Sequence, residues 1–161
     1  MTLERIVSGG QTGIDRGALD AALAADFPCG GWCPARRKSE DGRIPPRYPL
    51  RELDGGYARR TLQNLVDSDG TLILFRGELD GGTELTRSEC ERRRRPWVTI
   101  DAADHDPAQA ASLAAAFIDA QGIRTLNVAG PRASNWAGGA AYAEAVMTAL
   151  IRTARTRRDA G

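Results

Sequence analysis

The sequence is poor in the residues that carry much of protein chemistry, with one histidine, three cysteines and two methionines among 161 residues. Cys29, Cys33 and Cys90 are odd in number and lack the spacing of a disulfide framework, so we expect free thiols in a reducing cytoplasm. Cys29 and Cys33 are also wrongly spaced for a zinc knuckle, and His105 lies far along the chain. We therefore expect no metal site.

A long apolar run and an excess of charge of one sign are also missing. No stretch is long enough to span a bilayer, and Glu4 and Arg5 interrupt the place where the apolar part of a signal peptide would lie. Twenty-two basic and 21 acidic residues give a formal net charge of +1, whereas a nucleic-acid-binding surface normally brings a clear basic excess. We expect a cytoplasmic protein with neither nucleic acid nor membrane as a partner.

Apolar stretches alternate with helical patterns along the chain, which is typical of a parallel sheet covered by helices. The pattern predicts strands at 3–7, 28–32, 70–75, 97–100 and 125–129. It predicts helices after the first strand, at 57–66, from the glycines at 81–82 through Arg95, at 107–121 with Gly122 as the cap, and near the C-terminus. No repeat or domain boundary is visible. We predict one α/β domain over residues 1–158, with about five mostly parallel strands, helices on both faces and a frayed tail at 159–161.

Three glycine-rich segments follow predicted strands and lead into helices: Ser8–Asp15, Gly77–Thr86 and Gly130–Gly139. The first turn of a helix offers unpaired N–H groups and a positive dipole end, and glycines let a phosphate approach the backbone. Ligands of open parallel sheets bind at the carboxyl ends of the strands. We therefore predict that the three segments form one anion pocket; the alternative is that they are only tight turns. Thr12 and Asp15 also have the spacing of a capping box.

Groups that could catalyse a reaction are few. Neither Ser8 nor Ser134 has a neighbouring base, so no hydrolase triad can be assembled. The carboxylates near the predicted pocket are Asp15, Glu40 and Glu84. Asp15 and Glu84 are therefore the only, and weak, candidates for catalytic residues.

The segment from Pro34 to Gly56 contains four prolines and many charges but no periodicity. A long stretch without secondary structure is normally a binding loop, a lid or disorder. Two interpretations stay equally open: a solvated loop, or a lid whose cations Arg36, Arg37 and Lys38 close on an anionic ligand. Trp32 and Trp136 are expected in the core, with stacking on a heterocycle as the alternative.

Six blocks of the sequence carry a family resemblance that spans residue 6 to about residue 150. In order they are SGGQTGIDRGALDAAL, GGWCPARRKSEDGRIPPRYPL, RTLQNLVDSDGTLIL, GGTELT, PWVTID and NVAGPRASN. With these blocks the chain resembles the bacterial putative molybdenum carrier proteins. Those are similar to the molybdenum cofactor carrier proteins and belong to the SLOG group of Rossmann-like nucleotide-ligand binders.

The resemblance implies a Rossmann-like fold, a homo-oligomer (dimer or tetramer) and a pocket for a phosphate-bearing ligand. That ligand would be the molybdenum cofactor, a pterin with a terminal phosphate, or a nucleotide. The resemblance also implies the ligand contacts, with the last three as the weaker ones: Gly9, Gly10, Gln11, Thr12, Asp15, Arg16, Gly81, Gly82, Thr83, Arg132, Ser134 and Asn135.

Three departures from related patterns bear on function. Arg36 stands where the resembled carrier family usually has a glycine, and Ala137-Gly138 stands where that family usually has Pro-Gly. Phosphoribohydrolases of the wider group carry P-G-G-x-G-T-x-x-E, whereas this chain has one glycine fewer and places Glu84 directly after Thr83. The sequence thus favours a carrier or sensor of a phosphorylated heterocycle. A nucleotide-processing hydrolase is the alternative, and a regulatory subunit is a third class.

Overall fold

A central sheet of five parallel strands organises the computed structural model, which describes all residues from 1 to 161. The strand order is β2-β1-β9-β7-β8, and every neighbouring pair is parallel. The strands are β1 (Arg5–Val7), β2 (Cys29–Gly30), β7 (Gly70–Phe75), β8 (Trp97–Asp101) and β9 (Thr125–Ala129). The predicted parallel sheet of about five strands is therefore confirmed.

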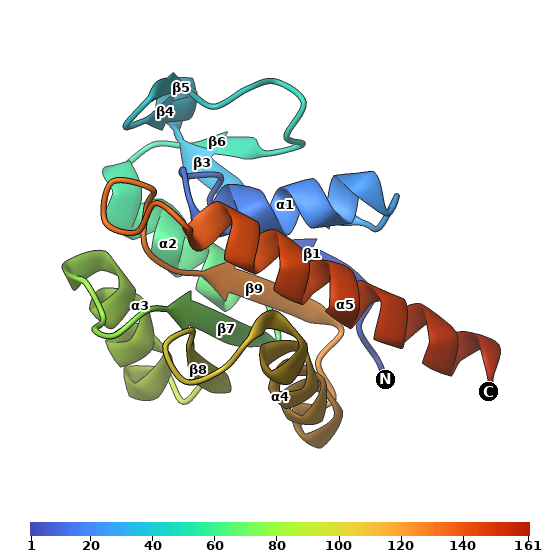
Figure 1. Ribbon diagram of the computed structural model, residues 1–161. Coiled ribbons are helices and arrows are strands. Elements are labelled where there is room, and N and C mark those ends of the chain that lie inside the picture. The colour runs from blue at the N-terminus through green and yellow to red at the C-terminus, as the bar shows by residue number, and fades with distance from the viewer.

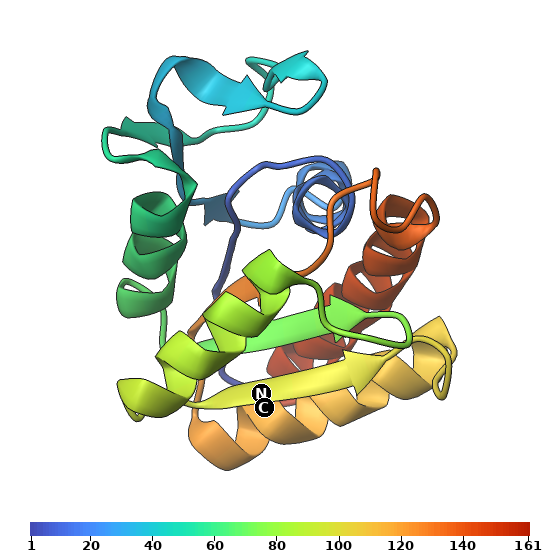
Figure 2. The same cartoon turned by 90° about the vertical axis from the view of Figure 1, so that its left-hand side faces the viewer.

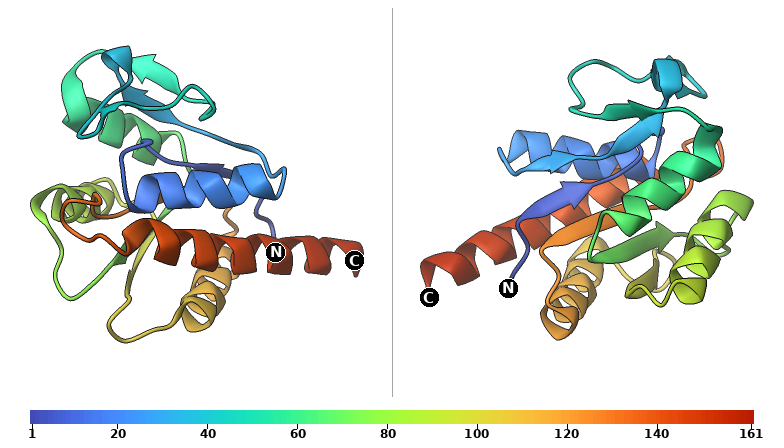
Figure 3. Two further views of the ribbon diagram at one scale, coloured as in Figure 1. Left: turned by 45° about the horizontal axis from the view of Figure 1, so that its top comes forward. Right: turned by 180° about the vertical axis from the view of Figure 1, so that it is seen from behind.

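Helices cover both faces of this sheet, as predicted. The first face carries α1 (Ile14–Ala24), α4 (Pro107–Gln121) and α5 (Gly139–Asp159), while the other carries α2 (Gly56–Val66) and α3 (Gly81–Arg92). Figure 2 shows β7 and β8 lying between α3 and α4, and Figure 3 shows α1 running alongside α5 in one view and α2 and α3 in front of the sheet in the other. None of these helices combines the length and the apolar character needed to cross a membrane.

The main core lies between the sheet and the face formed by α1, α4 and α5 (Figure 1). Alanines of α4 and α5 pack there against buried aliphatic residues of the strands, which lets the helices approach the sheet closely. Helix α4 begins at a capping box between Asp106 and Gln109 and ends at Gly122 in the left-handed conformation, with φ 63°. The predicted cap at Gly122 is thus confirmed.

The segment 34–56 is folded, so the expectation of a stretch without structure is wrong. Four short strands, β3 (Trp32–Pro34), β4 (Lys38–Ser39), β5 (Gly42–Arg43) and β6 (Arg51–Leu53), form two small sheets beside the single turn η1 (Ala35–Arg37). Buried Arg37 donates hydrogen bonds to the carbonyls of Ile44, Pro45 and Tyr48. Ile44 and Tyr48 pack on Leu19 of α1. Prolines have no N–H to donate, and the guanidinium of Arg37 supplies donors to the backbone carbonyls of this segment instead.

Several boundaries differ from the sequence prediction, and three of them are larger than a shift of one or two residues at the start or end of a strand or helix. The expected strand 28–32 is split at Gly31, with φ 130°, into β2 and β3, which belong to different sheets. Helix α3 ends at Arg92 and not at Arg95, because Arg94 adopts a left-handed conformation with φ 54°. Helix α5 continues to Asp159, so the arginine-rich end of the chain is helical up to that residue.

The connections at the carboxyl ends of the strands leave toward opposite faces. The chain leads from β1 and β9 to α1 and α5 on one face, and from the neighbouring β7 to α3 on the other. Such a divergence between adjacent parallel strands opens a crevice beyond their carboxyl ends.

Candidate ligand-binding site

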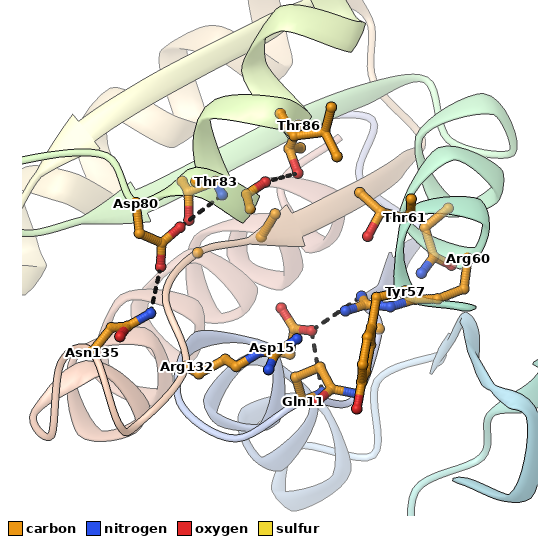
Figure 4. A pocket seen from close by; sticks show the side chains of 18 of the residues that line it. Gln11, Asp15, Tyr57, Arg60, Thr61, Asp80, Thr83, Thr86, Arg132 and Asn135 are labelled. Atoms are coloured by element: carbon orange, nitrogen blue, oxygen red, sulfur yellow. Dashed lines mark hydrogen bonds and ion pairs between the residues drawn. The ribbon is translucent and has the colours of Figure 1, made fainter. Parts of the chain in front are cut away.

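A cavity of about 480 Å³ occupies this crevice, bounded by α2, α3, the end of β9 and the loop after β1 (Figure 4). Its volume is within the range of small-molecule sites. Residues of all three glycine-rich segments line it, so these segments meet at one cavity, as predicted. The wall is formed by Gly9, Gln11, Asp15, Tyr57, Ala58, Arg60, Thr61, Asn64, Asp80, Gly81, Gly82, Thr83, Leu85, Thr86, Asn127, Val128, Ala129, Gly130, Arg132, Ser134 and Asn135.

The predicted contact residues divide into two groups. Nine lie in the wall of the cavity: Gly9, Gln11, Asp15, Gly81, Gly82, Thr83, Arg132, Ser134 and Asn135. Gly10, Thr12 and Arg16 do not line it, and neither does Glu84, one of the two candidate catalytic residues.

Asp15 and Arg60 form an ion pair in the wall (Figure 4). Nη1 of Arg60 lies 3.5 Å from Oδ2 of Asp15, and the two side chains are only 11% and 8% exposed. The same Oδ2 accepts a hydrogen bond of 3.2 Å from the backbone N–H of Gln11. Burial raises the pKa of Asp15 and lowers that of Arg60, and the charge of each opposes the shift of the other. The pair thus holds a carboxylate and a guanidinium side by side in a buried part of the wall.

Two polar atoms in the same wall have no hydrogen-bond partner, Oε1 of Gln11 and Nε of Arg60. The amide of Gln11 is fixed because its Nε2 donates to the carbonyl of Lys38 at 3.1 Å. Oε1 is therefore left as an acceptor, while Nε of Arg60 is a donor. Buried polar atoms in native proteins are almost always hydrogen-bonded, so unpartnered ones need an explanation.

The backbone of the loop after β1 is occupied by the protein itself. The N–H of Gln11 is bound to Asp15, and the N–H of Ile14 donates to the carbonyl of Pro131 at 3.3 Å. Helix α1 begins after Gly13 with no side-chain cap, so the predicted capping box of Thr12 and Asp15 is wrong. The carboxylate of Asp15 instead accepts from the backbone N–H of Gln11, which would otherwise be buried without a hydrogen-bond partner.

The glycines of this loop are also packed against other segments. A Cβ on Gly9 would overlap the Arg60 guanidinium, and one on Gly10 would overlap Leu50 of the segment 34–56. A Cβ on Gly13 would lie 2.5 Å from the carbonyl oxygen of Pro131, and its φ is 85°. Backbone contact thus requires a glycine at position 13, whereas at Gly9 and Gly10 the neighbouring side chains fill the space.

Thr12 and Arg16 attach the segment 34–56 to the first and third loops. Arg16 binds the carboxylate of Asp41 through both terminal nitrogens and also donates to Ser39. Oγ1 of Thr12 accepts from the backbone N–H of Ala133 and donates to Glu40. Both side chains therefore act as joints between loops.

Glu40 and Asp41, beside this joint, have lowered pKa values. Hydrogen bonds from Ser134 and Thr12 lower the pKa of Glu40, and those from Arg16 and Ser39 lower the pKa of Asp41. The two carboxylates are therefore ionised at neutral pH and hold the segment 34–56 against the loops.

The start of α3 differs from the loop after β1, because no other segment fills the space beside its glycines. Asp80 caps the helix by accepting from the N–H of Thr83 at 2.7 Å, and it also accepts from Nδ2 of Asn135 at 3.0 Å. Burial alone would raise the pKa of Asp80, but these hydrogen bonds outweigh it and hold the pKa below its ordinary value. A Cβ on Gly81 would meet no atom within 4 Å, and one on Gly82 would meet only Asp80 at 3.9 Å. The first turn of α3 is therefore open to the cavity.

Arg132 stands between the two sides of the cavity. Its guanidinium lies 4.6 Å from the centroid of the Tyr57 ring, which Arg60 also approaches at 5.9 Å. Its positive charge favours the ionised forms of Asp15 and Asp80. Since two arginines and two aspartates line the wall, the formal charges balance. Attraction for an anion then depends on the unpaired N–H groups and the dipole at the start of α3.

Other residues discussed from the sequence lie away from the cavity. Glu84 pairs with Arg87 on the outside of α3, and the hydrogen bonds from Arg87 lower its pKa. Arg36 and Lys38 are exposed, while Arg37 binds carbonyls of its own segment, so no cation of a closing lid lines the cavity. Trp32 donates to Asp67, and Trp136 packs beside Tyr142. Neither indole is part of the wall.

Sequence reasoning missed the contribution of α2. Tyr57, Arg60, Thr61 and Asn64 follow one another at helical spacing and line the cavity from one side. Asn64 is occupied by both backbone groups of Trp32, whereas the other three face the cavity more freely. A polar and aromatic stripe on a helix next to a predicted pocket was the signal that would have identified them.

Comparisons with known proteins support the fold and the family. A model of the circularly permutated YpsA SLOG family matches residues 6–151. The crystal structure of Putative molybdenum carrier protein from Syntrophus aciditrophicus SB is similar, with a TM-score of 0.90 and 38% sequence identity over 93% of this chain and 96% of that one. A search of curated proteins finds no match. No group of three or more His, Cys, Asp or Glu side chains is arranged to hold a metal ion.

Proposed function

Since the chain belongs to the circularly permutated YpsA SLOG family, we propose that it binds a phosphorylated heterocycle in the cavity and acts as its carrier or sensor. The observation that carries the proposal is the open first turn of α3, where Gly81 and Gly82 leave space beside Arg132. Unpaired N–H groups at a helix start and one arginine are the donors that a phosphate monoester needs.

The cargo that the similar structure suggests by its name is a molybdenum-related one. The wall fits a phosphorylated pterin in two respects. It combines the open helix start with buried polar atoms that have no partner, Oε1 of Gln11 and Nε of Arg60. Gly81, Gly82 and Arg132 would hold the phosphate, with Thr83, Ser134 and Asn135 beside it, and Gly9, Gln11, Asp15 and Arg60 would contact the ring. A nucleotide satisfies the same requirements, and both ligands belong to the proposal.

Calorimetry with paired ligands tests it. Guanosine and adenosine 5′-monophosphates are compared with their nucleosides, and 6-hydroxymethylpterin phosphate with the free pterin. We expect the phosphate to improve affinity by at least about tenfold, roughly 1.4 kcal/mol. Arg132→Gln should abolish that gain, while Arg59→Gln, which removes an exposed arginine outside the wall, should keep it. Equal affinities with and without phosphate would contradict the proposal.

One observation favours the hydrolase alternative. Asp15 lies in the wall, and burial raises its pKa, which is a property of general acids. Glu84, in contrast, is engaged by Arg87 outside the wall. Incubation with nucleotides should therefore give no sustained release of free base or inorganic phosphate if the protein is a carrier. Release that Asp15→Asn abolishes and Glu84→Gln leaves unchanged would establish a hydrolase.

We also propose that the chain forms a homo-oligomer through an exposed groove on α5. The groove is lined by Ala141, Glu144, Ala145, Thr148, Ala149 and Arg152. Glu144 and Arg152 stand four residues on either side of Thr148. Two copies of α5 packed antiparallel about Thr148 would therefore pair each Glu144 with the Arg152 of the other copy, and the alanines would allow close approach. Light scattering should give a multiple of 17.3 kDa. Thr148→Arg should give the monomer, and Thr156→Arg should not.

A further inference from the structure

The cavity contains a set of hydrogen-bonding groups that the phosphate of a ligand does not use. Gln11 is 2% exposed, and its Oε1 has no partner. Nε of Arg60 is likewise buried and unpartnered. The hydrogen bond from the Gln11 N–H and the ion pair with Arg60 both fall on Oδ2 of Asp15, and neither engages Oδ1. In Figure 4 this second oxygen points away from Gln11 and Arg60, toward the middle of the cavity.

The direction of each group is fixed by its surroundings. One N–H of the Gln11 amide nitrogen donates to the carbonyl of Lys38, which sets the orientation of the amide and leaves Oε1 as an acceptor. The carboxylate of Asp15 is held by the N–H of Gln11 and by Arg60, so it presents an acceptor. A guanidinium has only donors. The wall therefore places two acceptors, Oε1 of Gln11 and Oδ1 of Asp15, close to the guanidinium donors of Arg60.

This pattern is complementary to one kind of heterocyclic edge. A 2-amino-4-oxopyrimidine edge, as in guanine and in pterins, presents a ring N–H, an amino group and a carbonyl oxygen, which are two donor groups and one acceptor. The corresponding edge of adenine has an amino group and a ring nitrogen without hydrogen, so one acceptor of the wall would face another acceptor. Leaving buried polar groups unpaired is costly, which makes such sites selective.

We propose that Gln11, Asp15 and Arg60 read the 2-amino-4-oxopyrimidine edge of the ligand, so that the cavity selects guanine-type or pterin-type rings over adenine. The inference rests on the proposed function, because it assigns the ring end of the same cavity. The phosphate end, at α3 and Arg132, is shared by all phosphorylated ligands and supplies none of this selectivity.

The test uses a series of ligands with the unaltered protein. Calorimetry compares guanosine, inosine and adenosine 5′-monophosphates, which share the sugar and phosphate. Inosine monophosphate lacks only the amino group, and adenosine monophosphate reverses the edge. We expect affinity to fall in that order, with at least about tenfold between the first and the last. 6-Hydroxymethylpterin phosphate, which has the same edge, should bind at least as well as the guanine nucleotide, and the tighter of the two identifies the source.

Variants then locate the selectivity. Gln11→Met keeps the length of the side chain and removes the acceptor, so it should reduce the preference for guanosine over adenosine monophosphate by about tenfold. Gln63→Met makes the same change on α2 outside the wall and should keep the preference. Thermal unfolding of both variants controls for folding. Should Gln11→Met not fold, the ligand series alone decides.

The outcomes distinguish recognition of the ring edge from binding of the phosphate. Equal binding of all three nucleotides, weakened by Arg132→Gln, would overturn edge recognition and leave the phosphate site intact. A preference that persists in Gln11→Met would also overturn it. Binding of none of the phosphorylated ligands would overturn both proposals.

Discussion

The loop of residues 8–13 before α1 and the loop of residues 80–83 at the start of α3 look alike as sequences, since each places paired glycines between a strand and a helix. In the structure they are opposites. The first loop is filled by the protein: Arg60, Leu50 and Pro131 occupy the space beside its glycines, and the N–H groups of Ser8, Gly10 and Gln11 are bound internally. The second loop has empty space beside Gly81 and Gly82 and faces the cavity.

The difference shows that a glycine-rich turn before a helix can serve two separate purposes. One is to let parts of the same chain approach closely, and the other is to let a ligand approach. In the first loop the carboxylate of Asp15 binds the Gln11 N–H, as an anionic ligand would, so this loop orients a wall residue. In the second loop the N–H groups before Thr83 remain available. Substitutions in the two loops should therefore affect different properties.

The largest effect is expected from Gly13→Ala, which should lower the free energy of unfolding by about 3 kcal/mol. Its Cβ would meet the backbone of Pro131 and Ala133, which cannot move aside as a side chain could, and its φ is 85°. Gly77→Ala is the matched control, because Gly77 has a φ of 77° but no atom near its Cβ. It should cost about 1 kcal/mol for the conformation alone. Urea unfolding measures the free energy of unfolding of the two variants. Equal losses in Gly13→Ala and Gly77→Ala would contradict the close packing of the first loop.

Gly82→Val tests the second loop and should leave stability nearly unchanged, since its side chain enters open space. The same side chain would occupy the place of the proposed phosphate, so affinity for the best ligand should fall at least about tenfold, roughly 1.4 kcal/mol. Ser88→Val, on the same helix but outside the wall, should bind as the unaltered protein does. Normal binding by Gly82→Val would show that the two loops do not differ in function.

The joint formed by Arg16 and Asp41 should give a smaller, pH-dependent effect. The hydrogen bonds from Arg16 and Ser39 hold the pKa of Asp41 below its ordinary value, so the carboxylate stabilises the fold above about pH 4 and loses this contribution as pH falls further. Asp41 is 47% exposed, and solvent limits the gain to below about 1 kcal/mol. Asp41→Asn should therefore destabilise the protein at pH 7, and its difference from the unaltered protein should shrink steadily as pH falls from about 4 to about 2.

The control for this joint is Asp104→Asn, which removes an exposed carboxylate that makes no ion pair. Chemical denaturation across this pH range gives the comparison. A constant difference between Asp41→Asn and the unaltered protein from pH 7 to pH 2 would show that ionisation of Asp41 does not hold the joint.

The smallest effect is expected from Glu84→Gln. Glu84 follows the open glycines directly in sequence, but its carboxylate pairs with Arg87 on the outer side of α3 and is 46% exposed. Ligand affinity should change less than about twofold, and stability should hardly change, because solvent screens an exposed pair on a helix surface. A larger loss of affinity would mean that Glu84 turns into the cavity when ligand binds, and the assignment of the wall would need revision.

The sequence by itself determined the architecture. The buried apolar run at 70–75, the alternation of strands and helices, and the cap at Gly122 depend on local patterns, which short stretches of chain express independently of the rest. The same patterns located the three loops that meet at the cavity, because the carboxyl ends of parallel strands share one edge. The family blocks added the kind of ligand to be expected, which the match over residues 6–151 supports at the level of the family.

Only the tertiary structure decided which glycine loop is open. Leu50, Arg60 and Pro131 close the first loop, and they lie about 40, 50 and 120 residues away from it in the chain, so no local pattern could indicate them. For the same reason the sequence did not show that Arg37 folds the segment 34–56, or that α2 brings Tyr57 and Arg60 to the wall. Packing between distant segments fills the space beside the glycines of the first loop and leaves the space beside Gly81 and Gly82 open.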